Sequence, residues 1–208
     1  MNIPTQEAAQ LEVAALLERR RMAQAKERLK HFLQVYPEDQ ELLLLSGRAE
    51  YMDDNNEAAL SIAEQVLSQD PDNADARELL FDALKDEDRL AEAERVIIGL
   101  LKDYPEYAPF YGEYAMLMYQ AMLLKKARAL AEEGLKYDPD ELNCMYVRLL
   151  CDFIDKRKNS ETHSLQQLLA RHPDAMQTMV SLVLVLVKRG KFRAALQVSQ
   201  ELLRADPG

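Results

Sequence analysis

The sequence has no tryptophan, and among its 208 residues it has only two cysteines, three histidines and six glycines. It contains no glycine-rich phosphate-binding loop and no Gly-x-Ser-x-Gly nucleophile motif. The histidines, His31, His163 and His172, have no Cys, His or Asp partner at the spacing of metal ligands. The sequence therefore predicts a non-catalytic protein with no cofactor and no metal.

Long hydrophobic runs are also missing. The strongest, Leu182 to Val187, has six residues, against the roughly 20 that a membrane span needs. The N-terminus shows no charged-then-apolar leader. Cys144 and Cys151 lie seven residues apart, which is two turns along one helix and too far for a disulfide. We expect two buried, reduced thiols in a cytoplasmic protein without a membrane span.

Positive charge is scarce in one block. The net charge is −10, and residues 40–105 contain 17 Asp and Glu against 6 Lys and Arg. Because no basic stripe is present to neutralise phosphates, we expect no nucleic-acid partner. The acidic block is either a well-solvated surface or a region that steers a basic partner, and the sequence leaves both interpretations open.

Prolines, although few, are regularly placed. Six of the eight lie 34 residues apart, and an alanine recurs twelve residues before five of those six. A fixed period of this length indicates stacked helical hairpins, each with a first helix (helix A) and a second (helix B). Proline ends a helix, and the Asp, Glu or Asn that follows is suited to cap the next one. The periodic prolines are Pro37, Pro71, Pro105, Pro139, Pro173 and Pro207, and the alanines are Ala25, Ala59, Ala93, Ala127 and Ala195.

Residues 70–76 and 189–195 resemble the two most recognisable segments of the tetratricopeptide repeat, and the resemblance covers about residues 6–208. The family's aromatic residue near the start of helix A survives only as Tyr111, and its helix A glycine only as Gly47. The resemblance implies an all-α, right-handed superhelical solenoid of six repeats, with helix A lining a concave groove and helix B the outer surface.

The expected helices follow from the period. Helix A is predicted at about 6–19, 40–52, 74–86, 108–121, 141–155 and 175–188, and helix B at about 22–35, 57–69, 90–103, 124–137, 161–171 and 191–205. We expect one solenoid domain over 1–208, with repeats at about 6–39, 40–73, 74–107, 108–141, 142–175 and 176–208.

A partner would bind on helix A residues spaced by three, four and seven. This face is predicted to be acidic in the third repeat and apolar or aromatic from the fourth to the sixth, although a shift of one residue would make the apolar side chains core instead. The candidate partner-binding residues are Arg48, Tyr51, Asp75, Glu78, Asp82, Met116, Tyr119, Tyr146, Phe153, Leu184 and Val187.

The function that these features favour is a protein–protein interaction scaffold that binds a basic or apolar peptide or helix in its groove. Some relatives bind acidic chaperone tails through Lys, Arg and Asn. Here the corresponding positions hold Glu7, Gln10, Ala14, Leu44 and Asp75, so we expect no such tail. Two alternatives stay open, namely a self-associating structural module and a regulatory or tethering region of a larger protein.

Two local expectations concern the last repeats. Glu161 replaces the periodic alanine, so the helix there should begin late, near Ser160, with Glu161 in a first turn open to solvent. The helix around 182–187 is apolar on all sides, and the sequence shows no seventh hairpin that could cover its outer side. We therefore expect that end either to pack against a second copy, giving a homodimer through the C-terminal repeat, or to be continued by more chain.

Overall fold

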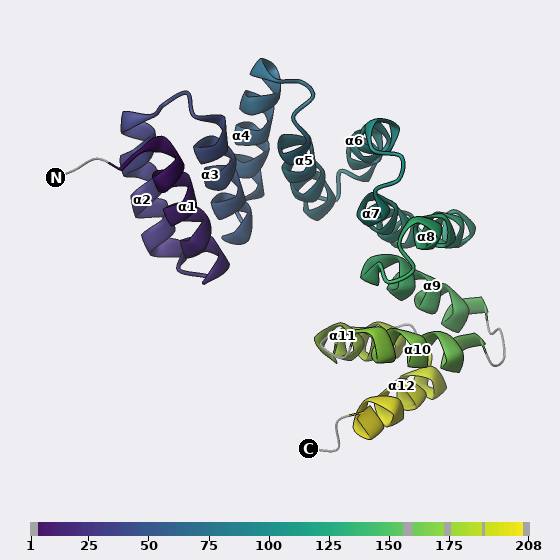
Figure 1. Ribbon diagram of the computed structural model, residues 1–208. Helices are drawn as coiled ribbons and strands as arrows, with labels where there is room; N and C mark the ends of the chain where they lie inside the picture. The colour runs from purple at the N-terminus through teal and green to yellow at the C-terminus, as the bar shows by residue number, and fades with distance from the viewer. Residues whose placement is uncertain (1–3, 156–159, 173–175, 189, 206–208) are drawn as a thin grey trace. The chain divides into compact units, whose positions relative to one another are not determined.

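The computed structural model describes residues 4–155, 160–172, 176–188 and 190–205, and within these ranges it contains twelve α-helices and no strand. The helices pair as antiparallel hairpins (Figure 1), which confirms the expected all-α, helical-hairpin fold. The chain divides into two compact units, Met1–Asp103 and Tyr104–Gly208.

The first unit contains three hairpins, whose helices have the bounds α1 Gln6–Glu18, α2 Met22–Val35, α3 Gln40–Met52, α4 Asn56–Gln69, α5 Ala74–Asp86 and α6 Leu90–Asp103. The second unit contains α7 Ala108–Gln120, α8 Leu124–Tyr137, α9 Leu142–Asp155, α10 Ser160–Arg171, α11 Met176–Lys188 and α12 Phe192–Ala205. Every predicted helix is present, and each boundary differs from its expected position by at most one residue. Helix α10 begins at Ser160, as expected, while the side chain of Glu161 lies outside the described residues.

The turn between helix A and helix B has one backbone conformation in all five places where the structure describes it. One residue has a positive φ, and its amide bonds the carbonyl three residues back, as Met122 does to Tyr119. The next amide reaches five residues back, as Leu123 does to Met118. This pair of bonds is the Schellman motif that closes a helix C-terminus. The positive-φ residues are Arg20, Asp54, Asp88, Met122 and Gly190.

Several helices A begin just after a residue whose side chain caps the helix, and these capping residues recur with the 34-residue period. Thr5, Asp39 and Asn73 each accept a hydrogen bond from the backbone amide three residues on, and Glu141 accepts from the Cys144 amide at 2.5 Å. Each bond satisfies an amide that the first turn of a helix leaves without a partner. Tyr107 occupies the same place before α7 without a side-chain bond, and there Pro109 in the first turn favours the helix start instead.

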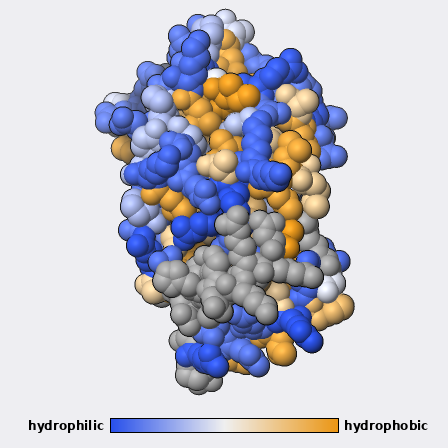
Figure 2. All heavy atoms as spheres, turned by 90° about the vertical axis from the view of Figure 1, so that its right-hand side faces the viewer, coloured by the Kyte–Doolittle hydropathy of each residue, from blue (hydrophilic) through white to orange (hydrophobic). Residues whose placement is uncertain are grey.

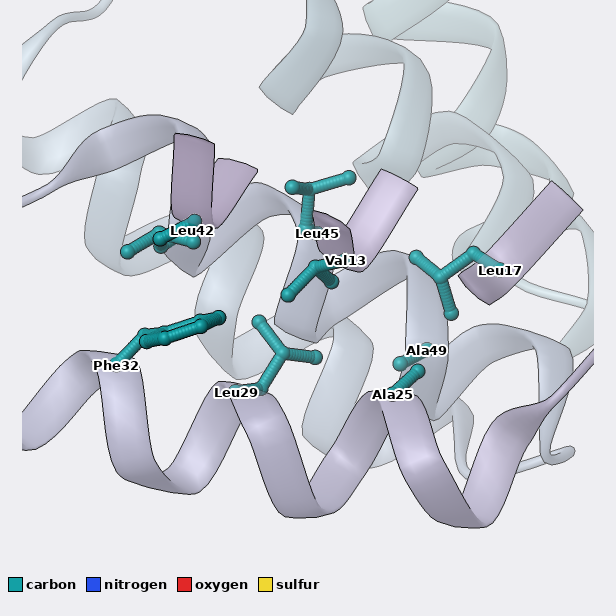
Figure 3. Packing of buried hydrophobic residues seen from close by; sticks show 9 residues of the cluster. Val13, Leu17, Ala25, Leu29, Phe32, Leu42, Leu45 and Ala49 are labelled. Atoms are coloured by element: carbon teal, nitrogen blue, oxygen red, sulfur yellow. The ribbon is translucent and has the colours of Figure 1, made fainter. Parts of the chain in front are cut away.

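The core of each hairpin forms around the periodic alanines. Ala25, Ala59, Ala93 and Ala127 are fully buried and Ala195 is 5% exposed. Figure 3 shows the first of these cores, where Ala25, Leu29 and Phe32 of α2 meet Val13 and Leu17 of α1 and Leu42, Leu45 and Ala49 of α3. A small side chain at the alanine position lets the two helix backbones of a hairpin approach closely.

Candidate functional site

Two faces of helix A decide where the candidate residues lie, and we define them on α3. The leading face of α3, which is Leu42, Leu45 and Ala49, packs on the preceding hairpin. The trailing face of α3, which is Leu44, Arg48 and Tyr51, is directed toward α5, since Arg48 and Tyr51 bond to that helix. On the other helices A the two faces are the positions related to these by the 34-residue period. All the candidate residues except Asp75 lie on trailing faces.

In the first unit the trailing face of α3 is half-open. The Arg48 guanidinium lies 2.5 Å from Asp75, with 43% and 56% of the two side chains exposed. The Tyr51 hydroxyl donates to Asp86 at 2.8 Å. Burial raises the pKa of Tyr51 above its ordinary value, and the hydrogen bond to Asp86 raises it further. Tyr51 therefore stays a neutral donor at physiological pH.

Beside Arg48 there is an apolar hollow of about 270 Å³ between α1 and α3. Leu17 and Leu45 are buried in its floor, whereas Met52, on its wall, is 42% exposed. We call this site the α1–α3 hollow, and its lining residues are Ala14, Leu17, Glu18, Leu45, Arg48 and Met52.

Helix α5 continues the surface from Arg48 with a row of carboxylates, which we call the acidic row. Its members are Asp75, Glu78, Asp82 and Asp86. Asp82 accepts from Lys85 at 2.9 Å, and the Lys85 ammonium also lies 5.0 Å from the centre of the Phe81 ring. Asp75 and Asp86 are exposed and Glu78 and Asp82 are half-buried, so the row stays partly exposed.

In the second unit most of the candidate stripe is core. Tyr119, Tyr146 and Phe153 are 6%, 8% and 3% exposed, and Met116 is half-buried. Burial, with a smaller contribution from Tyr119, raises the pKa of Tyr146 to about 12. Of the two interpretations that the sequence left open for these side chains, the structure favours core over an exposed binding stripe.

The remaining two candidates lie on α11, where the trailing face is exposed. Leu184 is 58% exposed and Val187 44%. On helix α12, Phe192, Leu196 and Leu203 are each at least 60% exposed. Hydrophobic atoms also reach the surface between hydrophilic ones on the face seen in Figure 2.

Sequence reasoning missed a second groove in the first unit. A hollow of about 320 Å³ is lined by residues of α4, α5 and α6. Gly99 lines it, and nothing lies within 4 Å of the position that a Cβ on this residue would take. A glycine in the middle of an otherwise regular helix B was the available signal. The other lining residues are Leu67, Pro71, Arg77, Leu80, Arg95 and Val96.

Two features are missing from the residues that the structure describes. No group of three or more His, Cys, Asp or Glu side chains among them is placed to hold a metal ion. No helix in the described ranges is long and apolar enough to cross a membrane. Cys144 and Cys151 are buried and form no disulfide, as expected. Burial and the nearby Glu141 carboxylate raise the pKa of the Cys144 thiol, so it stays protonated at neutral pH.

Comparison with known proteins agrees with this geometry. One tetratricopeptide repeat family model matches residues 51–109, and a second matches residues 11–74 and 163–208, which is more than half of the chain. The chain belongs to the tetratricopeptide repeat family. Proteins of this family generally serve as protein-interaction scaffolds, and no curated protein matches the sequence significantly.

Solved tetratricopeptide repeat structures share the fold. The chain is similar to PilF of Pseudomonas aeruginosa, with a TM-score of 0.71 and 18% identity over 97% of this chain and 92% of that one. It is similar to MamA from Desulfovibrio magneticus RS-1, with a TM-score of 0.67 and 15% identity over 81% and 95%. It is also similar to YrrB, described as having an unusual peptide-binding site, with a TM-score of 0.60 and 13% identity over 83% and 89%.

One departure from the tetratricopeptide repeat pattern has a clear structural use. Arg77 replaces the family aromatic near the start of α5, and its side chain is 16% exposed. The guanidinium donates to the Pro71 carbonyl at 2.8 Å and to Asp72 and Asp103. Arg77 thereby ties the turn before α5 to the end of α6 with hydrogen bonds where the family pattern would use ring packing.

Proposed function

We propose that this protein is a non-catalytic interaction scaffold whose first unit binds a basic, partly apolar segment of a partner protein. The observation that carries the proposal is the continuity of the α1–α3 hollow with the acidic row, because Arg48 lines the hollow and also contacts Asp75. A single bound segment would thus meet an apolar anchor point first and a row of carboxylates next.

The size of the hollow favours a side-chain anchor over a small-molecule site. Its volume of about 270 Å³ falls below the roughly 300–1,000 Å³ of pockets that enclose drug-sized ligands. The buried leucines of its floor and the exposed Met52 suit an apolar side chain, and methionine adapts its shape to different partners. The hollow would therefore hold one anchor residue of a longer segment.

The acidic row supplies attraction without a large desolvation cost. The Arg48–Asp75 pair lies at the surface, and an exposed pair of this kind contributes about 0–1 kcal/mol. A partner lysine or arginine can replace this pair at little expense. Carboxylates at this spacing also raise the association rate of a basic segment, which salt weakens.

A labelled helical peptide with alternating Lys and Leu on one face tests the proposal, with a Glu-for-Lys peptide as its counterpart. We expect fluorescence anisotropy to show tighter binding of the Lys peptide. The Asp82→Asn/Asp86→Asn double variant should weaken that binding about 10-fold, since two charge contacts of roughly 0.7 kcal/mol each are lost. Met52→Gln should weaken it independently of salt.

The matched control removes the same charge elsewhere. Glu57, on α4, and Glu106, in the turn before α7, are exposed, so Glu57→Gln/Glu106→Gln changes the net charge equally without touching the row. Equal binding of the Lys and Glu peptides, or equal losses in the two double variants, would rule out the acidic row as the binding surface.

A further inference from the structure

The first helix presents the same face to solvent that α5 uses for internal packing. In α5 the leading face is Ala76, Leu79 and Ala83, which are 0%, 4% and 0% exposed. The residues 68 positions earlier, two periods back, are again Ala, Leu and Ala, namely Ala8, Leu11 and Ala15 of α1. Leu11 is 65% exposed. We call these three residues the head face.

The last hairpin exposes apolar residues at positions that are buried one period earlier. Val180, Leu184 and Val187 form the trailing face of α11 and are 42%, 58% and 44% exposed. One period earlier, Tyr146, Leu150 and Phe153 of α9 are 8%, 2% and 3% exposed.

Helix α12 adds to the same surface. Leu203 is 68% exposed, while its equivalent in the first hairpin, Leu33, is half-buried and packs on the cluster that contains Leu42 and Leu45 of α3. Leu203 thus occupies the position against which a leading face rests in the first unit. We call Val180, Leu184, Val187 and Leu203 the tail face.

We propose that the head face of one copy of this chain docks on the tail face of a second copy. We expect a second copy of the chain on the tail face because the head face has the same residue types, Ala, Leu and Ala, that α5 buries on its leading face. Charge agrees with this pairing. Helix α1 carries three Glu and no Lys or Arg, whereas α11 and α12 together carry three basic residues and one Glu. Glu12 already pairs with Arg28, and Arg204 with Glu201, so the charges that distinguish the two ends are Glu7 and Glu18 on α1 and Lys188 and Arg193 on α11 and α12.

Neither the internal packing nor the charges support a tail-to-tail dimer. It would oppose two trailing faces, a contact that no described pair of hairpins makes, and it would bring the basic residues of two copies together. A head-to-tail contact uses two different surfaces, so each added copy leaves one head face and one tail face open. The assembly should therefore grow with concentration and not stop at two copies.

Two blocked variants test the proposal in sedimentation velocity runs over a range of concentrations. Leu11→Gln blocks the head face, and Leu184→Gln/Leu203→Gln blocks the tail face. All three leucines are more than half exposed, so the folded chain should tolerate the changes, which circular dichroism would verify. Ile98→Gln is the control, since Ile98 is 48% exposed on α6 and belongs to neither face.

The expected result is that the wild type and Ile98→Gln grow beyond two copies, whereas each blocked variant stays monomeric. An equimolar mixture of the two blocked variants should then form a closed pair, because one supplies an intact head face and the other an intact tail face. If Leu11→Gln fails to fold, Ala8→Arg blocks the head face instead, since Ala8 is exposed. A wild type that stays monomeric at several hundred micromolar overturns the proposal. A discrete dimer that the head-face variant leaves intact, which would indicate tail-to-tail pairing, also overturns it.

Discussion

Replacing Gly134 with alanine should destabilise the protein, whereas the same change at Gly99 should stabilise it. Both glycines lie inside helices B, where alanine is favoured over glycine by about 0.5–1 kcal/mol. Their surroundings differ. A Cβ on Gly99 would meet nothing within 4 Å, but a Cβ on Gly134 would lie 2.5 Å from the Cys144 sulfur and 2.8 Å from the Tyr111 Cβ.

The magnitude at Gly134 follows from these contacts. The Tyr111 Cβ is fixed to its backbone and the Cys144 side chain is fully buried, so neither yields easily. Forcing an extra methyl group into such a core costs about 1–3 kcal/mol, which exceeds the gain in helix propensity. We expect Gly134→Ala to lower the free energy of unfolding by about 1–2 kcal/mol and Gly99→Ala to raise it by about 0.5–1 kcal/mol.

Urea unfolding followed by circular dichroism measures both changes. Adding Cys144→Ala removes the nearer of the two obstructing atoms, so the Gly134→Ala/Cys144→Ala protein should lose less stability than the sum of the single variants, by about 1 kcal/mol. A Gly134→Ala protein as stable as Gly99→Ala, or strict additivity in the cycle, would show that α8 does not approach α9 and α7 as closely as described.

Three further predictions concern single side chains. Asp152 is 1% exposed and lies 2.6 Å from Arg128, so Asp152→Ala should lower the free energy of unfolding by about 3 kcal/mol. Asp140 pairs with Arg171 at the surface, so Asp140→Ala should lower it by less than about 1 kcal/mol. Equal losses in thermal unfolding would contradict this. Met122 has φ 61°, so Met122→Gly should stabilise by about 0.5–1 kcal/mol and Met122→Ala should not. Because the pKa of Tyr146 is raised to about 12, its stabilising contribution is complete below pH ~10 and is lost, by about 2–3 kcal/mol, as pH rises to ~12. Tyr146→Phe should flatten that part of the stability curve, and an unchanged curve would exclude the assignment.

The sequence predicted the helices well because their ends are decided locally. A proline, an Asp39 or Asn73 cap and a positive-φ turn residue each act within a few residues, so the period alone located every boundary to within one position. Burial of the periodic alanines also follows from local geometry, because it depends on how closely the two helices of one hairpin approach.

The candidate site was harder to predict because exposure on helix A depends on the neighbouring hairpin. The same periodic position is Arg48, partly exposed and ion-paired, in α3, and Leu150, buried, in α9. A pattern of apolar residues every three or four positions describes both faces of helix A equally well. Only the packing between hairpins distinguishes an aromatic core at Tyr146 and Phe153 from an open stripe.

The turns within and between hairpins are closed by hydrogen bonds that recur along the chain, and each of these bonds joins residues that are close in sequence. The amides that close the Met122 turn and the cap at Asn73 bond only within a few residues of chain. An insertion or deletion of 34 residues, joined at equivalent positions, would therefore leave the same backbone groups satisfied and change only the side-chain contacts between hairpins. A change of one residue within a turn would break its closing bonds. The protein can thus lengthen or shorten by whole hairpins far more readily than by single residues, and each added hairpin would extend the surface that the helices A form.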